Sequence, residues 1–162
     1  MPIPGFAGSL PEGLEDLWRE LGLCAYADGL LWVVDPGDFA SSVHEWFGPD
    51  SGTLVIARSA FADLFMWRES RMVVLDPRSG RVTELPMPVS VFFSFALSRS
   101  NYRDALCNRE HFDIALPRLG KLSASECYGY FPALALGGSG EPDTIQRVGL
   151  FEHLSLLRQL TS

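Results

Sequence analysis

Four short apolar runs separated by turn residues occupy the middle of this 162-residue chain, and they limit its fold more than any other feature. The segment from Asp76 to Gly80 is typical of a tight turn, because Pro77 presets φ and Gly80 admits a positive φ. Strands that follow one another at such short intervals pair with their chain neighbours, which predicts an antiparallel meander. The four runs cover residues 53–58, 64–68, 71–76 and 81–85.

Helical patterns lie on both sides of the meander. Apolar residues at i, i+3, i+4 and i+7 predict an amphipathic helix over residues 11–21. The members of this stripe are Leu14, Leu17, Trp18 and Leu21. Further helices are expected at 35–47, 89–97, 101–107, 109–119 and 150–160. The remaining expectations are a loose arm at 1–10, a strand with an internal turn at 26–34, a strand and bend at 126–136, and a last strand at 144–148.

This order of elements predicts a fold class. Strands are grouped together and helices flank them at both ends, without the regular alternation of a parallel α/β sheet. We therefore expect an α+β fold with a mainly antiparallel sheet flanked by helices, built as a single compact unit. A chain of this length buries roughly 70% of the surface that its unfolded form exposes, so it needs no metal or disulfide to fold.

The charge of the chain restricts its partners. It carries 13 Lys and Arg against 20 Asp and Glu, a formal net charge of −7. A protein that binds DNA or RNA neutralises phosphates with basic side chains, so direct binding of nucleic acid is not expected. The negative charge suits either a basic protein partner or an ordinary acidic surface that keeps the protein in solution.

The cysteines and the N-terminus bear on location. Cys24, Cys107 and Cys127 form no C-x-x-C pair and are odd in number, which indicates reduced thiols and a reducing compartment. Residues 1–5 resemble no signal peptide, and the apolar run at 89–97 is too short to span a membrane. The expectation is a soluble cytoplasmic protein with no membrane partner.

No motif for catalysis, metal binding or a cofactor stands out. His44-Glu45 is followed by Gly48, where a zinc protease helix needs a second histidine. The glycine cluster at 137–140 lacks the Lys-Ser/Thr of a phosphate loop. We therefore expect no catalytic residue, no metal and no cofactor. One rival interpretation remains, a small enzyme that uses Cys127 or His153.

An acidic stretch is the best candidate for a binding surface. From Tyr26 to Thr53 the chain has no Lys or Arg. Tryptophan is a favoured interface anchor, and the stretch contains two, Trp32 and Trp46, interleaved with its acids. The candidate interface residues are Asp35, Asp38, Glu45, Trp46 and Asp50. The alternative is a solvated acidic face that only maintains solubility. Among the tryptophans, Trp18 and Trp32 are expected in the core and Trp46 partly so.

Three sequence blocks carry a family resemblance. The first runs from Pro11 to Trp46, with Asp28-Gly29-Leu30-Leu31-Trp32-Val33-Val34-Asp35-Pro36 at its centre, and the second covers residues 57–67. Both resemble the GAD-related domain of bacterial immunity proteins, which is expected over residues 1–70. The third block, residues 128–138 with Glu152-His153-Leu154, resembles the C-terminal immunity domain of these proteins, expected over residues 71–162. One departure is Ala62, where the family usually has glycine, so this position either has a negative φ or is slightly strained.

The resemblance implies a function. Proteins of this kind are encoded beside toxins delivered by type VI secretion, many of them DNases. Each binds its cognate toxin and protects the producing cell and its siblings. A non-enzymatic antidote of a nuclease is therefore the leading hypothesis, and a regulatory or scaffolding module that binds a protein unconnected with toxins is the alternative. Inhibition by covering the active site and inhibition by distorting the toxin both stay open.

Overall fold

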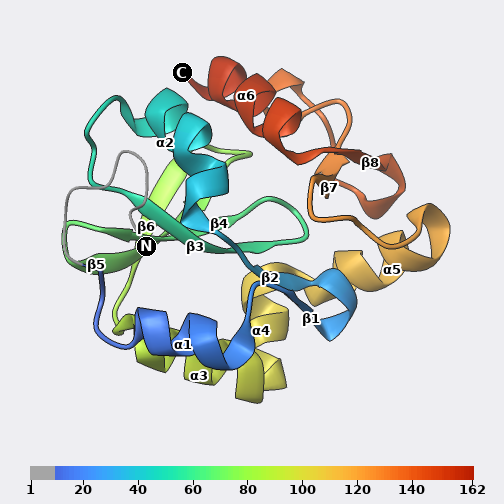
Figure 1. The fold of residues 1–162 in the computed structure, drawn as a ribbon. Helices are drawn as coiled ribbons and strands as arrows, with labels where there is room; N and C mark the ends of the chain where they lie inside the picture. The colour runs from blue at the N-terminus through green and yellow to red at the C-terminus, as the bar shows by residue number, and fades with distance from the viewer. Residues whose placement is uncertain (1–9) are drawn as a thin grey trace.

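Strands paired in chain order form the centre of the computed structural model, which describes residues 10–162 (Figure 1). Within these residues, six strands make one antiparallel sheet in the order β1-β2-β3-β4-β5-β6. Their bounds are β1 Ala25–Tyr26, β2 Leu31–Val33, β3 Leu54–Ser59, β4 Leu64–Arg68, β5 Arg71–Asp76 and β6 Arg81–Leu85. A separate antiparallel pair consists of β7 (Glu126–Tyr130) and β8 (Ile145–Gly149). The predicted meander is thus confirmed, and the arm expected at 1–10 falls almost wholly outside the described residues.

Helices cover both faces of the large sheet. In Figure 1, α1 (Leu14–Leu21) and α3 (Val89–Ser98) lie on one side of it, and α2 (Ala40–Phe47) and α6 (Leu150–Thr161) lie on the other. The helices α4 (Ser100–Cys107) and α5 (Arg109–Leu119) connect α3 to the second sheet. Short 3₁₀ turns complete the chain: η1 Ala27–Gly29, η2 Pro36–Phe39, η3 Leu134–Leu136 and η4 Pro142–Thr144.

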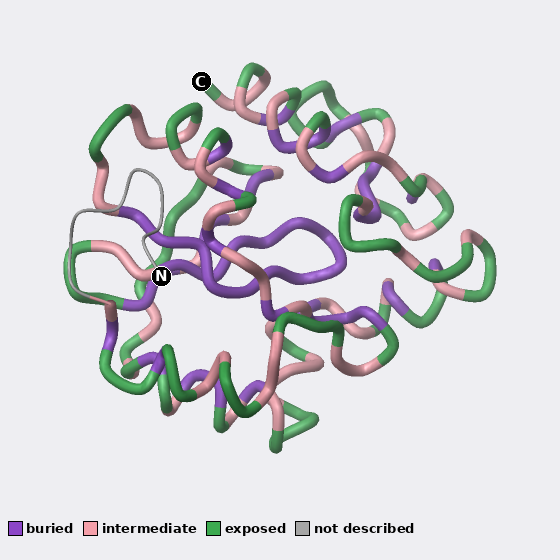
Figure 2. Tube along the Cα trace, in the orientation of Figure 1, coloured by how far each residue is buried: buried purple, intermediate pink, exposed green. Residues whose placement is uncertain are grey.

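The strand β3 is buried along its whole length (Figure 2). Side chains alternate between the two faces of a strand, so its residues enter two different apolar clusters. Ile56 packs in the cluster that contains Phe92 of α3, whereas Val55 packs in the cluster that contains Leu154 of α6. Antiparallel sheets often leave one face in water. Here both faces are covered, which explains why residues 54–57 form an unbroken apolar run.

The turn between β3 and β4 joins the large sheet to the C-terminal part. The amide of Tyr128 in β7 donates to the carbonyl of Ala60 at 2.8 Å. Phe61 stacks on Tyr130, with ring centroids 5.7 Å apart, and also contacts Tyr128 at 5.9 Å. All of these residues are buried. The two parts therefore share one core at this turn.

The structure confirms the α+β class and a compact unit. The internal turn expected in the strand at 26–34 is also confirmed: β1 and β2 are separated at Asp28, whose φ of 60° allows the turn. Ala62 also has a positive φ, 68°, so the strained conformation is the correct alternative at this position. A left-handed conformation costs a non-glycine residue about 1–2 kcal/mol.

Two tryptophans expected in the core are only half-buried. Trp32 lies between Leu31 and Val33 in β2, and its two neighbours point into the core while its own side chain points the other way. Trp18 packs against the core from α1, where only Leu14 is fully buried. The expectation for Trp46, partly buried, is confirmed.

We expect Phe61→Ala to destabilise the whole chain by about 3–5 kcal/mol, the usual cost of removing a buried phenylalanine. Phe61 is 1% exposed and contacts aromatic rings of the C-terminal part, so denaturant unfolding should stay a single transition with a lower midpoint. Phe95→Ala is the control, because Phe95 is half-buried and pairs with Tyr102 at the surface of α3. Equal losses for the two variants would contradict a shared core at the β3–β4 turn.

Candidate protein-binding face

The first two candidate acids flank the start of η2. Asp35 ends the strand region, and its Oδ1 accepts a hydrogen bond from the amide of Gly37 at 2.9 Å. This bond caps η2, and Pro36 takes the first position, where a missing N–H is harmless. Asp38 is exposed, and its carboxylate forms no salt bridge or hydrogen bond within residues 10–162. Asp35 thus caps η2, whereas the carboxylate of Asp38 faces solvent.

Glu45 and Trp46 are engaged in holding α2 against α6. Glu45 Oε1 accepts a hydrogen bond from the hydroxyl of Ser155 at 2.6 Å. Arg158 Nε donates to the backbone carbonyl of Glu45 at 3.3 Å, and the Arg158 guanidinium lies 5.8 Å from the centre of the Trp46 ring. The acidic stretch therefore has a cation beside it in space, although it has none in sequence.

Asp50 lies at the other end of α2, in the loop that leads to β3. It is exposed and has a φ of 56°. It borders a hollow of about 200 Å³ between the loop and α2, which His44 and Thr53 also line. The five candidates thus lie in three places. Asp35 and Asp38 lie beside η2, Glu45 and Trp46 contact α6, and Asp50 lies in the loop before β3.

A second hollow, of about 310 Å³, lies where η2 meets the C-terminal part. Its walls come from the β1–β2 region, from η2, from the loop before β7 and from α6. Asp35 and Asp38 both border it. We call it the seam hollow. Sequence reasoning did not find it, because its lining comes from four separate stretches of the chain.

Arg58 at the end of β3 is a fully buried cation next to this hollow. Its guanidinium lies 4.5 Å from the centre of the Trp32 ring and donates to the carbonyls of Ser59, Ser123 and Ala124 at 3.2–3.4 Å. Burial lowers the pKa of Arg58 to about 10, so it stays protonated at neutral pH. No carboxylate within residues 10–162 pairs with it, and its charge is held by carbonyl dipoles and the indole face.

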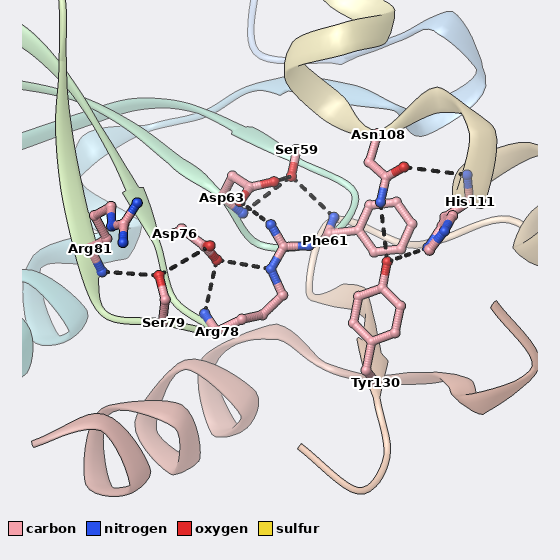
Figure 3. A network of polar contacts seen from close by, with 10 residues as sticks. All are labelled: Ser59, Phe61, Asp63, Asp76, Arg78, Ser79, Arg81, Asn108, His111 and Tyr130. Atoms are coloured by element: carbon pink, nitrogen blue, oxygen red, sulfur yellow. Dashed lines mark hydrogen bonds and ion pairs between the residues drawn. The ribbon is translucent and has the colours of Figure 1, made fainter. Parts of the chain in front are cut away.

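A second polar network lies beneath the β3–β4 turn (Figure 3). Arg78, in the hairpin turn between β5 and β6, forms ion pairs with Asp63 at 3.0 Å and with Asp76 at 2.8 Å. The hydroxyl of Ser59 donates to Asp63 Oδ2 at 2.6 Å. Burial raises the pKa of Asp63, and Arg78 offsets this only in part. For Asp76 burial also raises the pKa, but Arg78 and nearby hydrogen bonds outweigh it, and the net shift is downward.

The same network reaches the C-terminal part. The Arg78 guanidinium lies 5.9 Å from the centre of the Tyr130 ring. The Tyr130 hydroxyl contacts His111 Nδ1 at 2.7 Å and accepts from Asn108 Nδ2 at 3.2 Å, at the start of α5 (Figure 3). This arrangement positions β7 against the sheet.

The residues of the rival enzyme interpretation lie in the interior. Cys127 is fully buried, and burial raises the pKa of its thiol to about 12. His153 is 5% exposed, and burial together with Arg78 lowers its pKa to about 4. Within residues 10–162 no group of three His, Cys, Asp or Glu side chains could hold a metal ion. Every helix in the same residues is too short or too polar to cross a membrane.

We expect the buried His153 to make the fold sensitive to acid. The unfolded chain takes up a proton near pH 6.5, whereas the folded chain resists it down to about pH 4. Stability should therefore fall as the pH drops through this window, by up to about 3 kcal/mol for this group. Denaturant melts from pH 7 to 4 should show a weaker pH dependence for His153→Leu than for the parent. The same slope in both proteins would mean that folding leaves the pKa of His153 unchanged.

Comparisons with known proteins agree with this architecture. Residues 2–76 match the model of the GAD-like domain, and residues 88–161 match that of the T6SS immunity protein Tdi1, C-terminal. The crystal structure of Atu4351 from Agrobacterium tumefaciens is similar, with a TM-score of 0.71 at 20% identity, over 93% of this chain and 76% of that one. At this identity the likeness shows the fold. No curated protein matches the chain. The chain thus carries a GAD-like domain over residues 2–76 and a T6SS immunity protein Tdi1 C-terminal domain over residues 88–161.

Proposed function

We propose that this chain binds and neutralises a toxin delivered by type VI secretion, and that the toxin is a nuclease, specifically a DNase. The observation that carries the proposal is the match of residues 88–161 to the C-terminal domain of a type VI immunity protein. Such a protein works by binding. The GAD-like domain adds the η2–α2 segment, and with it the acids that we propose for the interface.

The charge of the chain supports a nuclease as the partner. A nuclease holds phosphates with a basic cleft, and this chain has a net charge of −7. Opposite charges speed up encounter and suppress binding of wrong partners. Asp38 and Asp50 are exposed, and neither carboxylate is paired within the described residues. These two acids are therefore the best placed of the five candidates to meet a basic surface.

The location and mode of action follow from the proposal. An antidote against a DNase has to act where the DNA lies, which is the cytoplasm of the producing cell and its siblings. It needs no catalytic group, cofactor or metal. It can cover the nuclease active site or hold the nuclease in a distorted shape, and a structure of the complex would distinguish these two mechanisms.

The proposal is tested with the toxin encoded beside this chain. The two proteins should co-purify, the chain should abolish DNA cleavage by the toxin in vitro, and co-expression should rescue cells that produce the toxin. A toxin active-site variant serves as the control for toxicity. A neighbouring toxin that neither binds the chain nor loses activity in its presence would refute the proposal.

We expect the association rate with this toxin to fall as salt rises, because exposed charges are screened beyond about 8 Å at physiological ionic strength. The double variant Asp38→Lys, Asp50→Lys should associate at least about tenfold more slowly at low salt and lose most of the salt dependence. Stopped-flow mixing from low to high salt measures both effects.

The matched control is Glu12→Lys, Glu20→Lys, which changes the net charge by the same amount. Both glutamates are exposed, and they lie in and just before α1, on the opposite face of the sheet (Figure 1). This control should associate at close to the parent rate. Equal slowing in the two double variants would show that only the overall charge matters and that the η2–α2 acids mark no interface.

A further inference from the structure

The seam hollow is built by both domains of the chain. Leu23, Trp32 and Phe39 come from the GAD-like part, and Ala124 and Phe151 come from the C-terminal part. Its volume of about 310 Å³ is at the lower end of the range for ligand pockets. A partner that enters it therefore touches both domains at once.

Large apolar side chains form most of its lining. The rings of Phe39 and Phe151 meet at 5.2 Å, which joins η2 to α6 at the edge of the hollow. Leu23 borders it and is 52% exposed, so it is open to a partner. The hollow thus offers a mostly apolar wall with a few polar groups, the kind of lining that can receive an apolar side chain of a partner.

The charges around the hollow indicate where a partner should carry a positive charge. Asp35 and Asp38 are its only charged lining residues within the described part of the chain. Arg58 stacks on Trp32 but is fully buried, so it acts on the hollow only through its field. That field disfavours a bare cation deep in the hollow, next to Trp32, while the two carboxylates favour a cation at the rim.

We propose that the seam hollow receives a loop of the toxin that inserts one large apolar side chain, with a Lys or Arg beside it that pairs with Asp38 at the rim. This inference rests on the proposed function and adds to it the place of contact and the chemistry of the contacting segment. The apolar anchor supplies most of the affinity, and the basic neighbour supplies orientation, as is usual at protein interfaces.

The decisive comparison uses two exposed leucines. Leu23→Ser removes the apolar rim of the hollow, and Leu136→Ser removes an even more exposed leucine, 64%, from η3 outside it. The probe is the toxin encoded beside this chain, inactivated in its active site. By titration calorimetry, Leu23→Ser should bind at least about tenfold more weakly than the parent, and Leu136→Ser should stay within about twofold. Thermal melts should show both variants folded.

Cys24 provides an independent readout. It is exposed and directly follows Leu23, whereas Cys107 and Cys127 are buried. Iodoacetamide should alkylate Cys24 in the free protein, and the inactivated toxin should slow this reaction strongly. Mass spectrometry of the peptide that contains Cys24 gives the rate, and the toxin's own cysteines are followed separately.

The outcomes separate the two proposals. A parent chain that binds no toxin refutes the proposed function, and the inference with it. A tight complex that Leu23→Ser leaves unchanged, with Cys24 still reactive, overturns the inference while the proposed function stands. If light scattering shows a dimer of the free chain that Leu23→Ser dissociates, the occupant is a second copy, and the inference is equally overturned.

Discussion

The fully buried Arg58 connects the large sheet to the segment just before β7, and the shape of the candidate site depends on this connection. Its guanidinium reaches from β3 across to the carbonyls of Ser123 and Ala124, just before β7. A buried charge is costly unless it is well satisfied, so these carbonyls and the Trp32 ring are needed to keep it in place. The same contacts fix one wall of the seam hollow, because Trp32 and Ala124 both line it. This wall of the seam hollow therefore depends on the charge of Arg58, which is buried and out of reach of a partner.

At the β3–β4 turn, Arg78 also connects the large sheet to the C-terminal part. It neutralises Asp63 inside the turn and lies against Tyr130 of β7. Phe61, in the same turn, packs against Tyr128 and Tyr130 of the second strand pair. Ala62 is held in a strained conformation at this point, where neighbouring contacts over-determine the backbone. The GAD-like and immunity parts thus form one core. A surface built from both parts is therefore rigid, which suits it to binding another protein.

Local signals in the sequence were sufficient to predict most of the fold. The turn at 76–80 and the short apolar runs identify β3 to β6, because hairpins between neighbouring strands depend on residues close in the chain. The surroundings of the candidate interface residues were predicted only in part. Arg158 lies 112 positions after Trp46 in sequence, and no local pattern indicates that it stacks there. Trp32 was assigned to the core because its neighbours are apolar, but the alternation of β2 turns it outward. The seam hollow needs the positions of Leu23, Asp38 and Phe151 together, which only the folded chain provides.

The central claim is that this chain neutralises a toxin through a face formed where its two domains meet. Amide hydrogen exchange of the chain, alone and in complex with its inactivated toxin, tests it most directly. We expect added protection in residues 23–39, in residues 123–126 and at the start of α6, because these segments surround the seam hollow. Protection restricted to α3, α4 and α5, with those segments unchanged, would place the interface elsewhere and contradict the account.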